Sequence, residues 1–246
     1  MRGVLQILRF NWPLYAVAAV GLVSVELGIR LIPIPSTPRA VLHLGTALSA
    51  VWIAGSLVAS WIIYDRSRLS SWEWIRDAIG LQPRRWVNIH AGFDEATAVL
   101  NRVLTPSDGR VFDIFNPEEM SEPSIGRARR RYRPEIDPEL VDFHTLPVGE
   151  GSIDAAFLLL SAHELRTDAA RTTLFDELHR VLSRAGRIIV AEHLRDWPNF
   201  AAFGPGFMHF FSRRTWVRCF ARARFVIDRE FSITPFVRVF VLRRSV

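Results

Sequence analysis

The chain contains no lysine, so every one of its 31 basic residues is an arginine. Such an exclusive use of arginine indicates a bias of composition, and arginine clusters alone are then poor evidence for nucleic-acid binding. The densest cluster, GRARRRYRP at residues 126–134, is interpreted first as a solvated helix end or loop. Contact with phosphate or anionic lipid is the alternative. No nucleic-acid partner is predicted.

Cysteine is almost absent. The single thiol, Cys219, excludes an intrachain disulfide and a thiolate metal cluster. Its surroundings, WVRCFARARF, are typical of a packed helix. The sequence therefore fits a reducing compartment, and its 49% hydrophobic and 23% charged residues indicate a folded chain.

Long apolar runs, in contrast, are present near the N-terminus, at residues 12–35 and 41–64. Each approaches the roughly 20 residues that a helix needs to cross the hydrocarbon core of a bilayer. The segment PIPSTPR between them is typical of a tight turn that breaks a helix. We predict a transmembrane helical hairpin over residues 1–65. A pair of buried core helices is the alternative.

Arginines flank the two apolar runs on one side. Arg9 precedes the first run, and Arg66 and Arg68 follow the second. By the positive-inside rule, both ends of the chain are predicted to face the cytoplasm from a cytoplasmic membrane that the chain crosses twice. Residues 66–83 form a linker in which SRLSSWEWIRDAIGL, residues 67–81, predicts an amphipathic helix on the membrane surface. Trp72 and Trp74 would then lie in the interfacial belt.

Residues 84–246 alternate between strand and helix patterns. This alternation predicts a doubly wound α/β domain with a mostly parallel, seven-stranded sheet. The last two strands, RFVIDREFSI and FVRVFVLRR, are separated only by TP and are expected to be antiparallel. The apolar runs of the other strands lie at residues 86–89, 110–115, 139–143, 153–160 and 186–194, with helical stretches at 94–104, 117–130 and 168–183.

Ligands of such a sheet bind at the carboxyl ends of its strands, close to the point where the strand order reverses. Candidate side chains follow each predicted strand. Asp113 lies 21 residues beyond Gly92, close to the spacing at which an acid receives ribose hydroxyls in dinucleotide-binding folds. The remaining candidates, in chain order, are His90, Asp94, Asp142, His163, Glu164, Glu192, His193 and Asp196.

Two segments resemble the class I S-adenosylmethionine-dependent methyltransferases. DFHTLPVGEGSIDAAFLLLSAHEL is similar to the family segment in which an acid precedes LP, a glycine-bearing turn follows and an aspartate opens the fourth strand. FDELHRVLSRAGRIIVAEHL resembles the helix, turn and fifth strand that come next. The resemblance covers about residues 84–244. It implies a Rossmann-like methyltransferase fold and S-adenosylmethionine as cofactor.

The resemblance also implies a set of cofactor-binding positions. The family's first loop reads roughly acid-x-Gly-x-Gly-x-Gly, and here only its middle glycine is kept. Asp113 matches the acid that binds the ribose, Asp142 matches the acid that faces the adenine amine, and Leu146 is an apolar wall for the adenine. The four loop positions are Asn88, His90, Gly92 and Asp94.

Methyl transfer from a sulfonium requires a positioned nucleophile and, for some acceptors, a group that removes its proton. Histidine suits this task because its ordinary pKa is near neutral. His163, His193 and His209 are the catalytic candidates, with structural packing as the alternative for each. A metal site built from the pairs His163-Glu164 and Glu192-His193 is a further alternative, but adjacent strand residues point to opposite faces. No metal ligand is therefore assigned.

A pocket held beside a bilayer favours an apolar acceptor. We predict a membrane-anchored methyltransferase that acts on a hydrophobic or amphipathic small molecule or lipid. The aromatic segment WPNFAAFGPGFMHFFSRRTW, residues 197–216, is a candidate for its substrate lid or else a loop packed on the sheet edge. A catalytically inactive, membrane-bound binding or scaffold protein is the alternative, favoured by the altered glycine loop.

Overall fold

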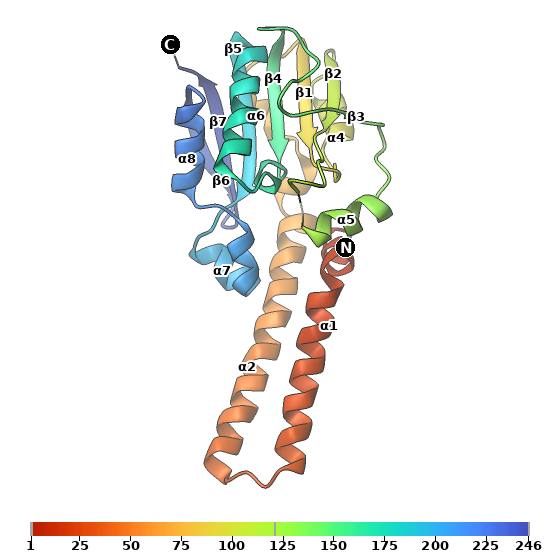
Figure 1. The fold of residues 1–246 in the computed structure, drawn as a ribbon, viewed down its shortest axis with the longest axis vertical. Coiled ribbons are helices and arrows are strands. Elements are labelled where there is room, and N and C mark those ends of the chain that lie inside the picture. The colour runs from red at the N-terminus through yellow and green to blue at the C-terminus, as the bar shows by residue number, and fades with distance from the viewer. Residues whose placement is uncertain (1, 121, 246) are drawn as a thin grey trace.

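The computed structural model describes residues 2–120 and 122–245. It shows an α/β unit standing on a long helical hairpin (Figure 1). The strands are β1 (Arg85–His90), β2 (Asp108–Asp113), β3 (Glu139–Leu140), β4 (Ile153–Leu159), β5 (Leu182–His193), β6 (Phe225–Thr234) and β7 (Val237–Arg244). The helices are α1 (Arg2–Leu31), α2 (Ser36–Trp61), α3 (Trp74–Ile79), α4 (Thr97–Val103), α5 (Pro123–Arg131), α6 (Asp168–Val181), α7 (Trp197–Phe203) and α8 (Arg213–Arg222).

The seven strands form one sheet in the order β3-β2-β1-β4-β5-β7-β6. Neighbouring strands from β3 to β5 are parallel, and β7 is antiparallel to both β5 and β6. The predicted fold class is confirmed, including the antiparallel pair at the end of the chain. The strand order reverses between β1 and β4, which is where ligands bind in sheets of this kind.

The central strands supply two hydrophobic cores, one on each face of the sheet. Along β4, Ala156 and Leu158 face the core that includes residues of α6 and α8, whereas Ala155 and Phe157 face the core on the other side. This alternation explains why β4 reads as one continuous apolar run, since a strand covered on both faces has no solvent side.

The linker after the hairpin differs from the prediction. It forms a short 3-10 turn, Arg68–Ser71, and the six-residue helix α3. Trp72 and Trp74 are each only 4% exposed and pack in the core that also contains Phe157. The predicted surface helix over residues 67–81 is therefore wrong, because its apolar residues cover the sheet and not a bilayer.

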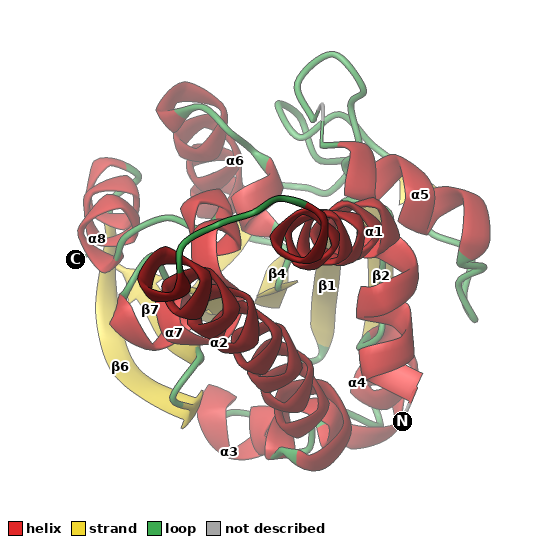
Figure 2. Ribbon diagram, turned by 90° about the horizontal axis from the view of Figure 1, so that it is seen from below, coloured by secondary structure: helices red, strands yellow, loops and turns green. Residues whose placement is uncertain are grey.

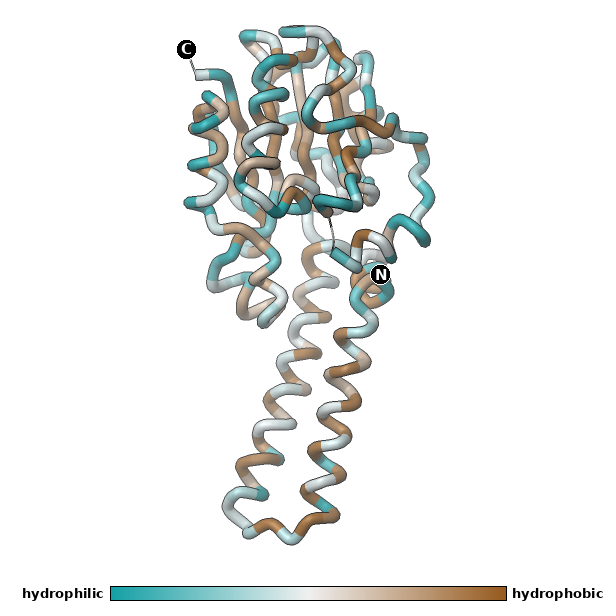
Figure 3. Tube along the Cα trace, viewed as in Figure 1, coloured by the Kyte–Doolittle hydropathy of each residue, from teal (hydrophilic) through white to brown (hydrophobic). Residues whose placement is uncertain are grey.

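Helices α1 and α2 form an antiparallel hairpin that projects from the α/β unit (Figure 1). Both are long and apolar enough to cross a membrane by length and composition, and only 6% and 11% of their most apolar windows is buried. Hydrophobic residues recur along both helices (Figure 3). Such low burial contradicts the alternative of a pair of core helices.

Helix α1 bends where it reaches the α/β unit. Asn11 has a non-helical backbone (φ −110°, ψ 15°), two residues before Pro13. A proline inside a helix removes one backbone hydrogen bond and clashes with the preceding turn, which accounts for the bend. Before the bend, the backbone N–H groups of Gly3 and Val4 donate to the carboxylate of Asp65, at 3.0 and 2.9 Å. The start of α1 is thus fixed to the end of the hairpin.

Glu26 lies within the apolar part of α1 and bonds across the hairpin. Its carboxylate contacts His43 Nδ1 at 3.1 Å and accepts a hydrogen bond from the Thr46 hydroxyl, both from α2. A carboxylate on an apolar helix costs free energy unless it has polar partners. His43 and Thr46 supply those partners to Glu26.

Candidate functional site

A cavity of about 970 Å³ lies at the carboxyl ends of the central strands. Seen from below, the ends of β1 and β4 lie between α1 and α2 (Figure 2). The cavity is lined by residues of the loop after β1, of α5, of the 3-10 turns Ala162–Glu164 and Gly204–His209, and of both hairpin helices. The cavity therefore lies where the strand-end rule places ligands, and the hairpin adds a wall that the rule does not include.

The loop after β1 folds its side chains back on itself. Asp94 Oδ1 accepts hydrogen bonds from the N–H groups of Ala96 and Thr97, at 2.9 and 3.0 Å, and so caps the first turn of α4. Asn88 Nδ2 donates to the same carboxylate at 3.1 Å. His90 Nδ1 accepts from the Gly92 N–H at 2.9 Å. The larger residues at positions 90 and 94 are thus accommodated, and all four predicted loop residues line the cavity.

Two polar atoms of this loop are buried without a partner among the described residues. They are Asn88 Oδ1 and His90 Nε2, on side chains only 2% and 4% exposed. Burial lowers the pKa of His90, which keeps its ring neutral and Nε2 free to take part in a hydrogen bond. A buried polar atom left unsatisfied is costly, so these two atoms indicate a place for the polar groups of a ligand.

Asp113 is buried at the end of β2, is not among the residues that line the cavity, and pairs with an arginine that the sequence did not single out. Its carboxylate forms an ion pair with Arg129 of α5 and also accepts the Phe115 N–H at 3.0 Å. The Arg129 side chain lies against Gly92, where a Cβ would collide with it. Gly92 is required for a second reason, because its φ of 102° is rarely adopted by other residues.

The two residues predicted to contact adenine lie outside the cavity lining. Asp142 is exposed and bonds to its neighbour His144, with Oδ1 and Nδ1 2.6 Å apart. Leu146 is 1% exposed within a hydrophobic core, and its backbone N–H donates to Glu177. The assignment of these two residues to this cavity is therefore corrected. One is turned to solvent and the other to the protein interior.

The three predicted catalytic histidines all line the cavity. His163 lies in the 3-10 turn after β4, and its Nδ1 is 2.7 Å from Glu192 Oε2 of β5. Burial would lower the pKa of His163, but the charges of Glu192 and Glu164 raise it to about 10. His163 is therefore protonated near neutral pH unless a cation binds next to it. A protonated imidazole cannot accept a proton from the acceptor.

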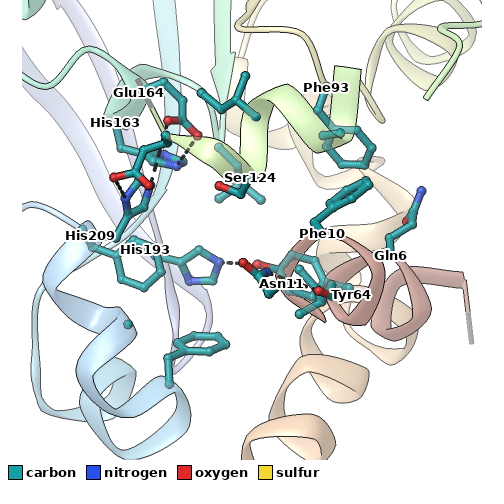
Figure 4. Close-up of a pocket in the computed structure, with 18 of the residues that line it drawn as sticks. Gln6, Phe10, Asn11, Tyr64, Phe93, Ser124, His163, Glu164, His193 and His209 are labelled. Atoms are coloured by element: carbon teal, nitrogen blue, oxygen red, sulfur yellow. Dashed lines mark hydrogen bonds and ion pairs between the residues drawn. The ribbon is translucent and has the colours of Figure 1, made fainter. Parts of the chain in front are cut away.

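His209 and Glu164 complete a cluster with His163 on one side of the cavity (Figure 4). Glu164 Oε1 is 3.4 Å from His163 Nε2, and Glu164 Oε2 is 3.9 Å from His209 Nε2. The expectation that adjacent residues 163 and 164 point apart is wrong, because they lie in a 3-10 turn and not in a strand.

His193 has the opposite electrostatic character. Burial lowers its pKa to about 4, so it is neutral at ordinary pH. Its Nδ1 is 2.9 Å from the Phe236 carbonyl oxygen, which places the ring proton on that nitrogen. The hydroxyl of Tyr64 then donates to Nε2 at 2.7 Å. Tyr64 and His193 are thus a hydrogen-bonded pair at the cavity wall (Figure 4).

Sequence reasoning missed Tyr64 and Glu122, which line the cavity from the end of the hairpin and from the segment before α5. It also missed Arg129 of α5, which pairs with Asp113. No spacing rule connects them to the strand ends. The aromatic segment at residues 197–216 was identified, and its residues 203–206 and 208–210 line the cavity.

Comparisons with known proteins agree with this geometry. Residues 116–190 match the family described as "Methyltransferase domain". The fold is similar to a SAM-dependent methyltransferase from Aquifex aeolicus, with 13% identity, a TM-score of 0.55 and coverage of 78% of this chain and 97% of that one. It is also similar to geranyl diphosphate C-methyltransferase from Streptomyces coelicolor A3(2), with 16% identity, a TM-score of 0.51 and coverage of 70% and 77%.

A curated relative is more similar in sequence over a shorter region. It is an uncharacterized 37.1 kDa protein of transposon Tn4556 from Streptomyces fradiae, 34% identical over 130 residues. The match covers 49% of this chain and 33% of the relative. The chain therefore spans about a third of the length of that protein.

Proposed function

Because the α/β unit belongs to the class I S-adenosylmethionine-dependent methyltransferases, we propose that this protein methylates an apolar or amphipathic acceptor that enters its cavity from a bilayer. S-adenosylmethionine, the cofactor of this family, supplies an electrophilic methyl group. The observation that carries the proposal is the composition of one cavity wall. The same cavity is lined by the loop after β1 and by side chains of both exposed apolar helices.

The residues present fit the cofactor. The loop after β1 offers Gly92 with its positive φ, and the unpartnered Asn88 Oδ1 and His90 Nε2 await polar groups. Asp113 would receive the ribose hydroxyls once Arg129 releases it. The volume lies at the upper end of the range of about 300–1,000 Å³ that ligand sites occupy, which leaves space for an acceptor beside a cofactor.

The hairpin supports a membrane location for this cavity. Leu14, Val17 and Val20 of α1 are between 66% and 72% exposed. Each side chain of this kind gains about 1.5–3 kcal/mol when it leaves water, and a bilayer would supply that environment. Leu14 also lines the cavity, so an acceptor dissolved in the bilayer would meet an apolar wall on its way to the strand ends.

Tyr64 and His193 are suited to remove a proton from the acceptor. In this proposal the acceptor donates its proton to the Tyr64 oxygen while Tyr64 passes its own proton to His193 Nε2. His193 is neutral and its other nitrogen already donates to Phe236, but its lowered pKa makes it a weak base, so the relay suits an acceptor whose own proton is acidic. The relay leaves the proton on His193 and a more nucleophilic acceptor.

The proposal is tested on the full chain reconstituted in lipid nanodiscs. Calorimetry with S-adenosylhomocysteine should show binding, and Asp113→Ala should weaken it at least tenfold, whereas the exposed Asp137→Ala should not. With S-adenosylmethionine labelled in its methyl group and bacterial lipid extract, label should appear in the organic phase. No binding at millimolar ligand would exclude the enzyme. Binding without transfer to any extract would favour the scaffold alternative.

A further inference from the structure

His163, Glu164 and His209 lie on the side of the cavity opposite Phe10 and Phe93 (Figure 4), and two further glutamates contact this cluster. The cluster is assembled from four separate parts of the chain. His163 and Glu164 come from the turn after β4, and His209 comes from the turn Gly204–His209. Glu192 comes from β5 and Glu122 precedes α5.

Each imidazole uses its Nδ1 atom for a carboxylate. His163 Nδ1 is 2.7 Å from Glu192 Oε2, and His209 Nδ1 is 3.3 Å from Glu122 Oε1. Both Nε2 atoms are thereby directed toward Glu164. A histidine that binds a metal almost always donates its other ring N–H to a carboxylate, a carbonyl or water, which fixes the ring and raises its basicity. Both histidines have this arrangement.

Two further observations support a binding site. The first shows how the two turns are held together, and the second shows a carboxylate oxygen without a hydrogen-bond donor. Arg166 Nη1 donates to the backbone carbonyl oxygens of both His163 and His209, at 3.0 and 2.7 Å, and so ties the two turns together. Glu164 Oε2 is buried and accepts no hydrogen bond among the described residues. Beyond its 3.9 Å contact with His209 Nε2, this oxygen is therefore available to a ligand in the cavity.

We propose that His163 Nε2, the Glu164 carboxylate and His209 Nε2 bind a divalent transition-metal ion, such as Zn²⁺, Fe²⁺ or Co²⁺. Two imidazole nitrogens and one carboxylate oxygen suit these ions better than Ca²⁺ or Mg²⁺, which prefer oxygen ligands. Glu192 and Glu122 orient the two rings. Since three ligands leave coordination positions open, the ion would bind an oxygen atom of the acceptor in the cavity.

The spacing of the ligand atoms is close to what an ion needs. The candidate atoms lie within 4.8 Å of one another. Ligands bound at about 2.0–2.2 Å lie about 3–3.5 Å apart, so the cluster must contract by roughly an ångström. His163 Nε2 and Glu164 Oε1 already have this spacing, at 3.4 Å. His209 has only to move inward, and it lies on a short, partly exposed turn.

The proposal is independent of methyl transfer and is tested by metal binding. The full chain in detergent is freed of metal with a chelator and titrated with Co²⁺, whose visible absorption reports the ligand set. We expect one Co²⁺ per chain, displaced by Zn²⁺. His209→Gln and Glu164→Gln should each weaken binding at least tenfold, and Glu122→Gln should weaken it less. His209 is partly exposed, so its substitution leaves the core intact.

His179→Gln is the matched control, because it removes a histidine of α6 that packs against Phe225, away from the cluster. It should leave Co²⁺ binding unchanged. Failure of the wild-type chain to bind Co²⁺ at millimolar concentration would overturn the proposal, and so would equal affinity of wild type and His209→Gln. In that case the cluster is an ion-pair network around a protonated His163. Calorimetry with S-adenosylhomocysteine on the same samples tests the proposed function separately.

Discussion

At the scale of single residues, Arg129 contacts two positions that we assign to the cofactor site. It covers Gly92, pairs with Asp113 and stacks over Phe115, with its guanidinium carbon 4.3 Å from the ring centroid. The Arg129 guanidinium and the ribose hydroxyls of the cofactor would compete for the same Asp113 carboxylate. We therefore expect Arg129 to oppose cofactor binding until its side chain moves aside.

We expect Arg129→Ala to tighten binding of S-adenosylhomocysteine by about threefold or more, because the Asp113 carboxylate and the space over Gly92 become available without breaking an ion pair, whose net strength is of order 1 kcal/mol. Calorimetry on the variant measures this. Arg131→Ala, an exposed arginine at the end of the same helix, serves as the control. Weaker binding by Arg129→Ala would mean that the guanidinium contacts the cofactor.

His193 gives a second prediction at this scale, which concerns pH. Its pKa is lowered to about 4 chiefly by burial, with further lowering from His163 and His209, whereas an unfolded histidine titrates near 6.5. The unfolded chain therefore binds more protons between these values, and stability falls as pH decreases from about 6.5 to 4. The loss from this group reaches up to about 3 kcal/mol.

Unfolding midpoints of wild type and His193→Gln, compared at pH 7 and pH 4.5, test this linkage. The pH dependence should be shallower in the variant, which has no proton to gain. Imidazole NMR signals provide a second measurement, because the wild-type spectrum should contain one ring that stays neutral at pH 5. A His193 signal with a midpoint near pH 6.5 would contradict the prediction.

At the scale of elements, α7 connects the cavity wall to the hairpin. The indole N–H of Trp52 in α2 donates to the carbonyl oxygen of Ala201 at 2.8 Å, and its ring meets Phe200 edge-on at 5.5 Å. The turn Gly204–His209, which carries His209, follows α7 directly. The position of α7 on α2 therefore determines how the cavity is closed on this side.

Removing this contact should loosen α7 without unfolding the sheet. We expect Trp52→Ala to increase amide hydrogen exchange about fivefold over residues 198–209, as the loss of roughly 1 kcal/mol of local stability implies. Exchange in β4 should not change. Trp61→Ala, on the same helix but next to Arg66, is the control. Equal exchange over residues 198–209 in both variants would show that α7 is held by other contacts.

The strands were predictable because their apolar runs are a local pattern in the sequence. The rule that ligands bind at strand ends then indicated where to look for the cavity. The sequence also predicted the helices α4 and α6 and the antiparallel pair of β6 and β7. It misplaced Trp72 and Trp74, since an amphipathic segment packs equally well on a sheet or a bilayer. It could not predict that Arg129 meets Asp113, nor that His209 meets Glu164, because these contacts join distant segments whose approach is fixed only by the complete fold.

At the scale of the whole molecule, the hairpin is part of the cavity wall. Helix α1 lines the cavity on both sides of its bend, as far as Ala18, and beyond the bend it also exposes apolar side chains that are suited to a bilayer. Insertion of the hairpin would therefore place the cavity at the membrane surface. The arginines at the ends of the two helices next to the α/β unit favour the cytoplasmic side for that unit.

Single engineered cysteines test this orientation. Burial raises the pKa of Cys219 to about 11, so the native thiol should remain unlabelled by maleimide. Ser36→Cys lies at the first residue of α2, next to the turn between the two helices, and Glu135→Cys lies on the α/β unit, both at exposed positions. A maleimide that cannot cross membranes should label Ser36→Cys in intact cells and Glu135→Cys only after lysis. The reverse pattern would invert the orientation, and recovery of the chain in the soluble fraction would exclude membrane insertion.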